Sequence, residues 1–222
     1  MSNSKIDVRT VHRSLSKARL QTYEKQAELY SCSALDLYTW NAQISSSMLV
    51  PLHFCEVTLR NAVSETLCKL YDDQWPWSLG FERSLPKAGY YKPASDLKAA
   101  RNKAKTTGQV IPELKFVFWQ KMFTRRFDDR IWLPEINSTF PNLPQESTPA
   151  ESREKIYQDL DIVRRLRNRI AHHEPIFQRN LARDYQTIHE LVFFRCHETA
   201  HWMHTHQQVT QQLNLQPFVP VN

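Results

Sequence analysis

Glycine is scarce in this chain, with only 3 among 222 residues, whereas proline occurs 12 times. Tight β-hairpin turns need residues that tolerate positive φ, and glycine is the usual choice. The phosphate-binding loops of dinucleotide-binding and P-loop proteins also depend on glycines at fixed spacing. The scarcity therefore argues against a hairpin-rich β protein and against both kinds of nucleotide-binding loop.

Paired cysteines and long apolar runs are also missing. The 4 cysteines form no C-x-x-C pair and stand far apart, at Cys32, Cys55, Cys68 and Cys196. We expect them to be free thiols in a reducing compartment. The amino-terminal MSNSKIDVRT has no apolar segment of the secretory kind, and residues 37–55 lack charge but include several polar side chains. A cytoplasmic protein with no membrane-spanning segment is expected.

The charge balance is basic, with 29 Lys and Arg against 23 Asp and Glu and a net charge of +6. A basic balance favours a polyanionic partner, RNA or DNA, although a basic protein without such a partner has the same composition. The hydrophobic fraction of 41% is ordinary for a globular protein, and 222 residues suit one large domain.

Apolar residues recur at helical spacing through the first third of the chain. Residues 11–30 are predicted to be helical. Ser33, three positions before Asp36, is a capping signal for a long helix that runs to about Tyr71. Pro51 lies inside that stretch and should kink the helix or split it in two.

The middle of the chain is rich in proline. Residues 72–93 and 134–149 are predicted to be connections with little regular structure. Between them we expect a short basic helix over residues 94–106, ending before Gly108, and a second helix that opens at Pro112. That second helix aligns four aromatic residues on one side: Phe116, Trp119, Phe123 and Phe127.

The last third begins with a strong helix signal, because Thr148 can cap, Pro149 suits the first turn and Glu151 can reach back. This helix should stop at Pro175, and a final helix is expected over residues 180–206. The chain is therefore predicted to be all-α, with few or no strands, as a single domain over residues 1–222. Its parts are N-terminal helices (11–71), an insert of shorter helices and loops (72–149), and the motif and C-terminal helices (150–206).

The string RNRIAHHEP, residues 167–175, places Arg167 and His172 near the end of a helix. An arginine can hold a phosphate bidentately, and a histidine can move a proton near neutral pH. Five helical steps separate the two side chains by about 140° around the axis, so they do not share a face. Asn168 does share a face with His172, and also with Arg164.

Arg167 lies beside the apolar stripe, near Ile170, where an unpaired charge is costly unless an anion or an interface meets it. A dimer packed through this helix end would supply an interface and a second Arg–His pair, and two histidines could then divide the base and acid roles. The alternative is a solvated basic helix tail, favoured by the helix dipole. That tail comprises Arg164, Arg165, Arg167 and Arg169.

Residues 166–176, LRNRIAHHEPI, resemble the active-site motif of HEPN ribonucleases, and more closely that of the abortive-infection (Abi) family of phage-defence proteins. Further stretches resemble other landmarks of the family, in the family's order: residues 38–41 (YTWN), 56–62 (EVTLRNA), 118–119 (FW) and Trp132. The resemblance implies a HEPN-like helical bundle with additional helices, which forms a homodimer with a composite active site. It also implies metal-independent RNA cleavage, without a cofactor, by attack of the ribose 2′-hydroxyl on the adjacent phosphate.

Carried over to this sequence, the resemblance makes Arg167 and His172 the catalytic pair. Asn168, His173 and Glu174 become supporting residues of the active site. The resemblance also implies a phage-defence protein or a toxin whose antitoxin is an RNA or a protein. Some HEPN toxins carry a modified tyrosine where this chain has Glu174, so that mode of neutralisation is not expected here. RNA-binding roles are assigned to Arg60, Asn61, Arg164 and Arg169, with a structural role left open for Arg60 and Asn61.

Residues 197–201, HETAH, match the zinc-protease pattern H-E-x-x-H. A catalytic zinc needs a third protein ligand, and no Asp or Glu follows Glu198. His204 would stand roughly 10 Å along the helix from His197, so one straight helix cannot close the site. A surface histidine cluster is therefore expected, and the role of His197, His201 and His204 stays open.

Two alternatives to the nuclease remain: a non-catalytic RNA- or protein-binding module of HEPN-like fold, and, with less support, the zinc metallopeptidase. The remaining aromatic sets are expected to be core residues rather than base-stacking platforms. These sets are Phe116, Phe118, Trp119 and Phe123, and Phe193, Phe194 and Trp202.

Overall fold

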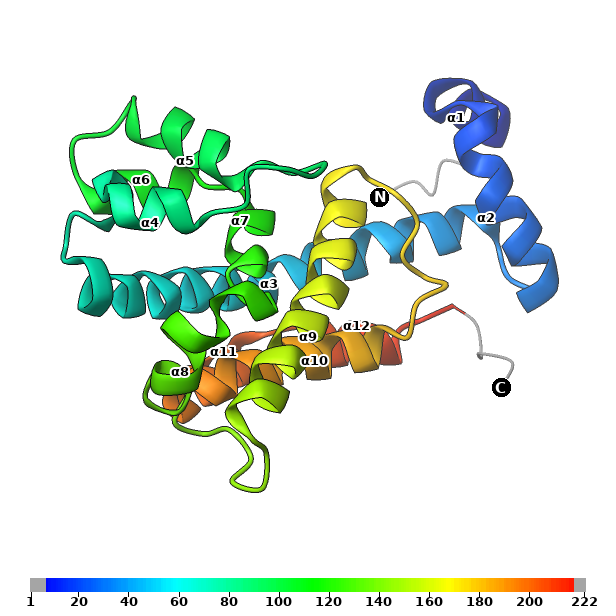
Figure 1. The fold of residues 1–222 in the computed structure, drawn as a ribbon. Helices are drawn as coiled ribbons and strands as arrows, with labels where there is room; N and C mark the ends of the chain where they lie inside the picture. Colours follow the sequence, from blue (N-terminus) through cyan, green and yellow to red (C-terminus); the bar gives the residue numbers. More distant parts are fainter. Residues whose placement is uncertain (1–6, 218–222) are drawn as a thin grey trace.

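The structure, a computed structural model, describes residues 7–217 as a set of packed helices (Figure 1). The helices are α1 (Val8–Leu15), α2 (Lys17–Tyr30), α3 (Ala34–Tyr71), α4 (Leu79–Ser84), α5 (Pro93–Arg101), α6 (Thr107–Glu113), α7 (Phe116–Lys121), α8 (Leu133–Thr139), α9 (Pro149–Ala171), α10 (Leu181–Arg195), α11 (His197–His206) and α12 (Val209–Asn214). Three shorter helical elements are η1 (Trp75–Trp77), η2 (Arg125–Phe127) and η3 (Asp128–Trp132). Residues 7–217 contain no strand, so the all-α prediction is confirmed.

Helix α3 is the axis of the fold, with α2, α9, α10, α11 and α12 packed along it. The insert of α4 to α6 lies near its C-terminal end, and α1 and α2 lie near its N-terminal end (Figure 1). Ser33 caps the helix as expected, since its hydroxyl accepts the Asp36 N–H at 3.4 Å. The helix is not split at Pro51. An internal proline costs about 3 kcal/mol, but the buried stripe continues through Met48, Leu52 and Cys55 and keeps both halves packed.

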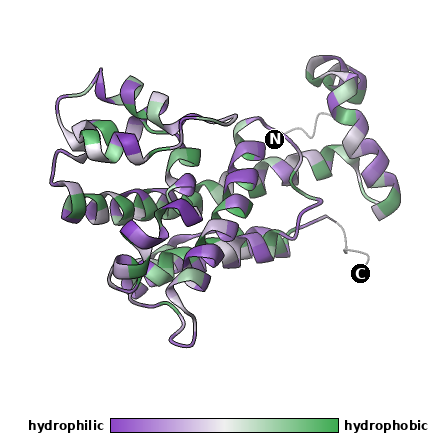
Figure 2. Ribbon diagram, in the orientation of Figure 1, coloured by the Kyte–Doolittle hydropathy of each residue, from purple (hydrophilic) through white to green (hydrophobic). Residues whose placement is uncertain are grey.

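Helix α9 begins with the reciprocal capping box that the sequence predicts. The Thr148 hydroxyl accepts the Glu151 N–H at 3.3 Å, and the Glu151 carboxylate accepts the Thr148 N–H at 2.8 Å. One face is buried through Ile156, Leu160, Val163, Leu166 and Ile170. Figure 2 shows polar and apolar residues side by side along the helices, which is the pattern of elements with one buried face.

The insert holds more helix than its prolines predict. Helix α4 and η1 form within residues 72–93, and α8 covers residues 134–139 of the second predicted connection. The reason is position: Pro76, Pro93 and Pro134 stand in the first turns of their elements, where no N–H is needed.

The predicted basic helix is α5, which ends at Arg101 and therefore before Gly108. The prediction that Pro112 opens a helix is wrong, because Pro112 lies inside α6. The aromatic line is broken into short elements. All four of its residues are nevertheless buried: Phe116, Trp119, Phe123 and Phe127.

Two predicted helices are each divided in the structure. Residues 11–30 form α1 and α2, because Ser16 adopts a φ of 72° between them. Residues 180–206 form α10 and α11, because Cys196 is extended, with φ of −156° and ψ of 114°. No helix in residues 7–217 is long and apolar enough to cross a membrane.

Candidate active site at the end of helix α9

The end of α9 falls inside the RNRIAHHEP string. Ala171 is the last helical residue and His172 is the C-cap. The Glu174 N–H donates to the Arg169 carbonyl at 2.8 Å and the His173 N–H donates to the Ile170 carbonyl at 3.0 Å, which is the Schellman pattern. His173 supplies the left-handed residue of this motif, with φ of 55° at a position where glycine is commonest.

The loop after this cap is held against α3 and α2. Asn41 of α3 is buried, and its side-chain oxygen accepts the N–H groups of Ile176 (2.8 Å) and Phe177 (3.2 Å). The Arg19 guanidinium of α2 donates to the His173 carbonyl. Asn41 belongs to the YTWN landmark, and its contacts give that landmark a structural reason: it fixes the chain just after the motif.

Arg167 projects from the last turns of α9 into an open hollow of about 610 Å³ against α3. Its neighbours there include His53, Phe54 and Glu56. The side chain is exposed, and within residues 7–217 its guanidinium has no hydrogen bond and no ion pair. The prediction that Arg167 lies at the margin of the packed face agrees with this position.

Arg60 of α3 is close enough to Arg167 for the two charges to interact, although it does not line the hollow. It is half-buried and forms an ion pair with Glu56, one turn back on α3, while its Nε is buried without a partner in the described chain. Burial lowers the pKa of Arg60; the carboxylate of Glu56 opposes the change, and the charge of Arg167 adds to it. Since Glu56 is paired with Arg60, the guanidinium of Arg167 is the charged group of the hollow that has no partner in residues 7–217 and could meet an anion such as phosphate. Asn61, the sequence neighbour of Arg60, is exposed.

His172 has a fully accessible setting at the helix cap. Its backbone N–H donates to the Asn168 carbonyl at 3.0 Å, whereas its exposed imidazole has no hydrogen bond to any residue of the described range. Asn168 is half-buried. Within one chain, therefore, Arg167 and His172 are not hydrogen-bonded to each other, and each side chain is left available.

The rest of the basic tail is paired with acids. Arg164 and Arg165 both bind Asp161, at 2.7 and 2.6 Å, and Arg169 binds Glu174 at 3.3 Å. Burial raises the pKa of Asp161, but the Arg164 and Gln120 hydrogen bonds and the arginine charges outweigh it, so the pKa is lowered overall. Among the four arginines of this tail, Arg167 alone has no partner in residues 7–217. A uniformly solvated basic tail does not describe this arrangement.

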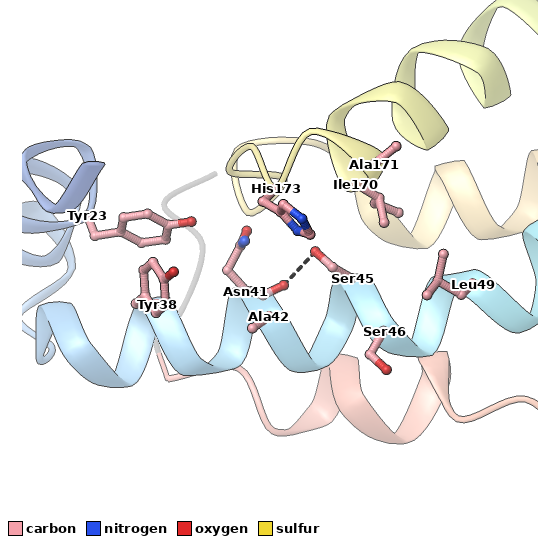
Figure 3. Close-up of a pocket in the computed structure, with 10 residues that line it drawn as sticks. All are labelled: Tyr23, Tyr38, Asn41, Ala42, Ser45, Ser46, Leu49, Ile170, Ala171 and His173. Carbon is pink, nitrogen blue, oxygen red and sulfur yellow. Dashed lines mark hydrogen bonds between the residues drawn. The ribbon is translucent and has the colours of Figure 1, made fainter. Parts of the chain in front are cut away.

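A second, narrower recess of about 400 Å³ opens beside the motif, between α2, α3 and the end of α9 (Figure 3). We call it the α2–α3 cleft. Its lining comprises Tyr23, Tyr38, Asn41, Ala42, Ser45, Ser46, Leu49, Ile170, Ala171 and His173. Leu49 also lines the hollow of Arg167, so the two recesses adjoin. The sequence analysis did not identify this cleft.

An exposed apolar face of α3 lies next to Arg167. We call the set Leu49, Val50, His53 and Val57 the α3 stripe; Leu49, Val50 and Val57 are 52%, 42% and 41% exposed. Trp202, expected in the core, is 57% exposed and packs edge-on against Phe54 at 4.9 Å, beside this stripe. Contiguous exposed apolar surface marks an interaction site. The sequence feature that could have indicated this exposed face is the absence of charged residues over residues 37–55.

The HETAH residues lie at the start of α11. The rings of His197 and His201 are parallel at 6.5 Å, and His204 is hydrogen-bonded through Nδ1 to the Tyr185 hydroxyl at 2.8 Å. Among the described residues, no three His, Cys, Asp or Glu side chains gather in a way that could hold a metal ion. His204 thus has a partner on α10.

No protein-family model, curated protein or solved structure matches this chain.

Proposed function

We propose that this protein is a metal-independent endoribonuclease of the HEPN type, acting on cytoplasmic RNA as a homodimer with a composite active site. One observation carries the proposal: at the end of α9 the side chains of Arg167 and His172 both lack a partner in residues 7–217. The neighbouring arginines of the same helix are all paired with acidic residues. The resemblance of residues 166–176 to the HEPN motif supports the same assignment.

The chemistry needs no metal. The ribose 2′-oxygen attacks the adjacent phosphorus while a neutral histidine takes its proton. The bond from phosphorus to the 5′-oxygen breaks, and a protonated histidine gives that oxygen a proton. Arg167 stabilises the charge of the pentacoordinate phosphate. The products are a 2′,3′-cyclic phosphate and a 5′-hydroxyl end.

Two copies supply the two histidines. Arg167 lines the hollow against α3 whereas His172, the C-cap of α9, does not, so a second chain is the simplest source of the opposing proton carrier. The α3 stripe supports this arrangement, because a twofold contact through one exposed apolar face pairs like with like. That contact buries the exposed Leu49 and Val50 beside the hollow of Arg167.

The remaining predicted residues take supporting roles. Glu174 holds Arg169 across the cap, and His173 supplies the backbone bend, so both keep His172 at its position. Arg60 and Arg167 together attract the phosphate backbone. Arg164 and Arg169 are already paired with acids, so their contribution to RNA binding is electrostatic and salt-sensitive.

The test is cleavage of a labelled RNA by purified protein in excess EDTA, with end-group analysis of the products. Arg167→Ala and His172→Ala should each abolish cutting, whereas Arg165→Ala, on the same helix, should cut normally. Two results would rule out the mechanism: cleavage that requires a divalent metal, or cleavage by both the Arg167→Ala and the His172→Ala proteins.

A second candidate is a non-catalytic RNA- or protein-binding module. One observation favours this candidate: within one chain the side chains of Arg167 and His172 form no hydrogen bond with each other. It predicts RNA binding without turnover and no effect of His172→Ala on binding.

The cellular role that follows from a nuclease of this type is phage defence or growth arrest as a toxin, with an RNA or protein antitoxin. Induced expression should stop growth in the wild type but not in His172→Ala. Equal toxicity of both proteins would contradict a role for cleavage.

A further inference from the structure

The α2–α3 cleft has flat apolar walls. Leu49 of α3 and Ile170 and Ala171 of α9 line one part of it, and the rings of Tyr23 and Tyr38 pack edge to face at 4.9 Å in another. The adjacent His172 belongs to the proposed active site. Recesses of this size, mostly apolar with a few polar atoms, are typical of small-molecule and cofactor sites.

One amide group in the cleft has a donor without an acceptor. Asn41 is only 5% exposed, and its side-chain oxygen is committed to two backbone N–H groups. Because an amide oxygen accepts and its nitrogen donates, these contacts fix which atom is which. The nitrogen Nδ2 then has no hydrogen-bond partner in residues 7–217, although the residue lines the cleft. Nδ2 is not one of the fully buried side-chain atoms that lack a partner, so it is accessible from the cleft and can donate to a ligand there.

Further polar groups surround this amide. Figure 3 shows the Tyr23 ring with its hydroxyl directed toward Asn41, and His173 on the other side of that amide. Burial raises the pKa of Tyr23 to about 12, with a smaller contribution from Tyr38, so the hydroxyl stays protonated and can donate. His173 occupies the left-handed position of the α9 cap and lines the cleft.

We propose that the α2–α3 cleft holds one unpaired nucleobase of the RNA, beside the phosphate that is cut. The proposal rests on the proposed nuclease function. A nucleobase has the required features: a flat ring for the apolar and aromatic walls, and carbonyl or ring-nitrogen acceptors for Asn41 Nδ2. Stacking on aromatic side chains is how proteins commonly hold splayed single-stranded bases. The cleft would therefore set a base preference at one position next to the cut.

The proposal is tested with a substitution that fills the α2–α3 cleft with a larger side chain at an exposed residue of its lining. Ala42→Phe places a ring in the cleft from α3, and Thr39→Phe is the matched control, exposed on the same helix and outside the lining. Cutting of a random-sequence RNA pool is read by sequencing, and KM and kcat are measured on one RNA. Wild type and Thr39→Phe should share one base preference, and Ala42→Phe should lose it with a KM at least tenfold higher. Sedimentation checks that all three have the same oligomeric state.

A second measurement separates this proposal from the nuclease itself. Fluorescence anisotropy with 2′-O-methyl RNA trinucleotides, which lack the attacking hydroxyl, reports binding without cleavage. Base-dependent binding that Ala42→Phe weakens tenfold supports the cleft even if the wild type cuts no RNA. Unchanged preference and KM in Ala42→Phe would overturn the cleft and leave the nuclease standing, and so would base-independent trinucleotide binding by an active wild type.

Discussion

Two stretches of this chain resemble functional motifs, RNRIAHHEP at the end of α9 and HETAH at the start of α11, and they differ in their contacts with the rest of the chain. At α9 the loop after the motif is tied to α3 through Asn41, and Arg167 is unpartnered in the described chain. At α11 His197 and His201 stand on an exposed helix, and His204 is bonded to Tyr185. The two stretches therefore differ in how distant residues position them and in which side chains have no partner among residues 7–217.

The largest expected effect is on the rate of RNA cleavage, compared between one histidine variant in each of the two stretches. His172→Ala should lower the rate of RNA cleavage by about 10³-fold or more, since general acid–base groups contribute about 10²–10⁴-fold. His201→Ala, equally exposed, should change the rate less than twofold. Initial rates in EDTA measure both. A large loss in His201→Ala would reverse the comparison.

A charge on the α3 stripe should separate the two copies of the chain. Val50→Glu is expected to give a monomer in sedimentation and to lower cleavage about 10²-fold, because each site loses the partner's proton carrier. Leu215→Glu, a charge on an exposed leucine of the C-terminal segment, is the control. A dimeric and active Val50→Glu protein would show that the stripe is not the contact.

Loss of the loop anchor should destabilise the α9 region. Asn41→Ala leaves the buried N–H groups of Ile176 and Phe177 without an acceptor, and unsatisfied groups cost about 1–3 kcal/mol each. We expect about 2–4 kcal/mol less stability in urea unfolding. Asn61→Ala, exposed on the same helix, should change it by less than about 0.5 kcal/mol. Equal stability of both variants would argue that the loop has other supports.

Removing the steric cost of the left-handed backbone at His173 should raise the stability of the fold. His173→Gly is expected to stabilise the fold by about 1 kcal/mol, because glycine adopts a positive φ without steric cost. His172→Gly, where φ is −94°, should instead destabilise it. Thermal unfolding compares the two glycines, and a loss of stability in His173→Gly would mean that the imidazole makes stabilising contacts.

The smallest effect concerns the histidines near α11. Burial lowers the pKa of His189 below 6.5, as do the neighbouring charges of His204 and His197, against Glu190. A lowered pKa means that the folded state binds the proton more weakly than the unfolded state, so stability present above pH 6.5 is lost as pH falls below it. His189→Gln should flatten this loss in urea midpoints between pH 7 and pH 5. An unchanged profile would exclude His189 as its source.

Local signals were sufficient where short-range contacts decide the structure. The starts of α3 and α9 were predictable because Ser33 and Thr148 each bond to a group three residues away. The breaks at Ser16 and Cys196 were not, since neither residue carries a glycine or proline signal. Three prolines of the insert were misinterpreted as breakers, because Pro76, Pro93 and Pro134 stand in the first turns of helical elements.

By itself the sequence determined the helical class, the start of α9 and the residue types of the motif, because these follow from periodicity and from bonds within one helical turn. The predicted stop at Pro175 was late, because α9 ends at Ala171 and His173 adopts a left-handed backbone. Only the tertiary structure decided which groups of the motif are available. Arg164 and Arg167 look alike in the sequence, yet Asp161 neutralises Arg164, and Arg167 faces α3 without a partner. Asn41 anchors a loop that lies 135 residues away. Contacts over such separations depend on how helices pack, which no local pattern encodes.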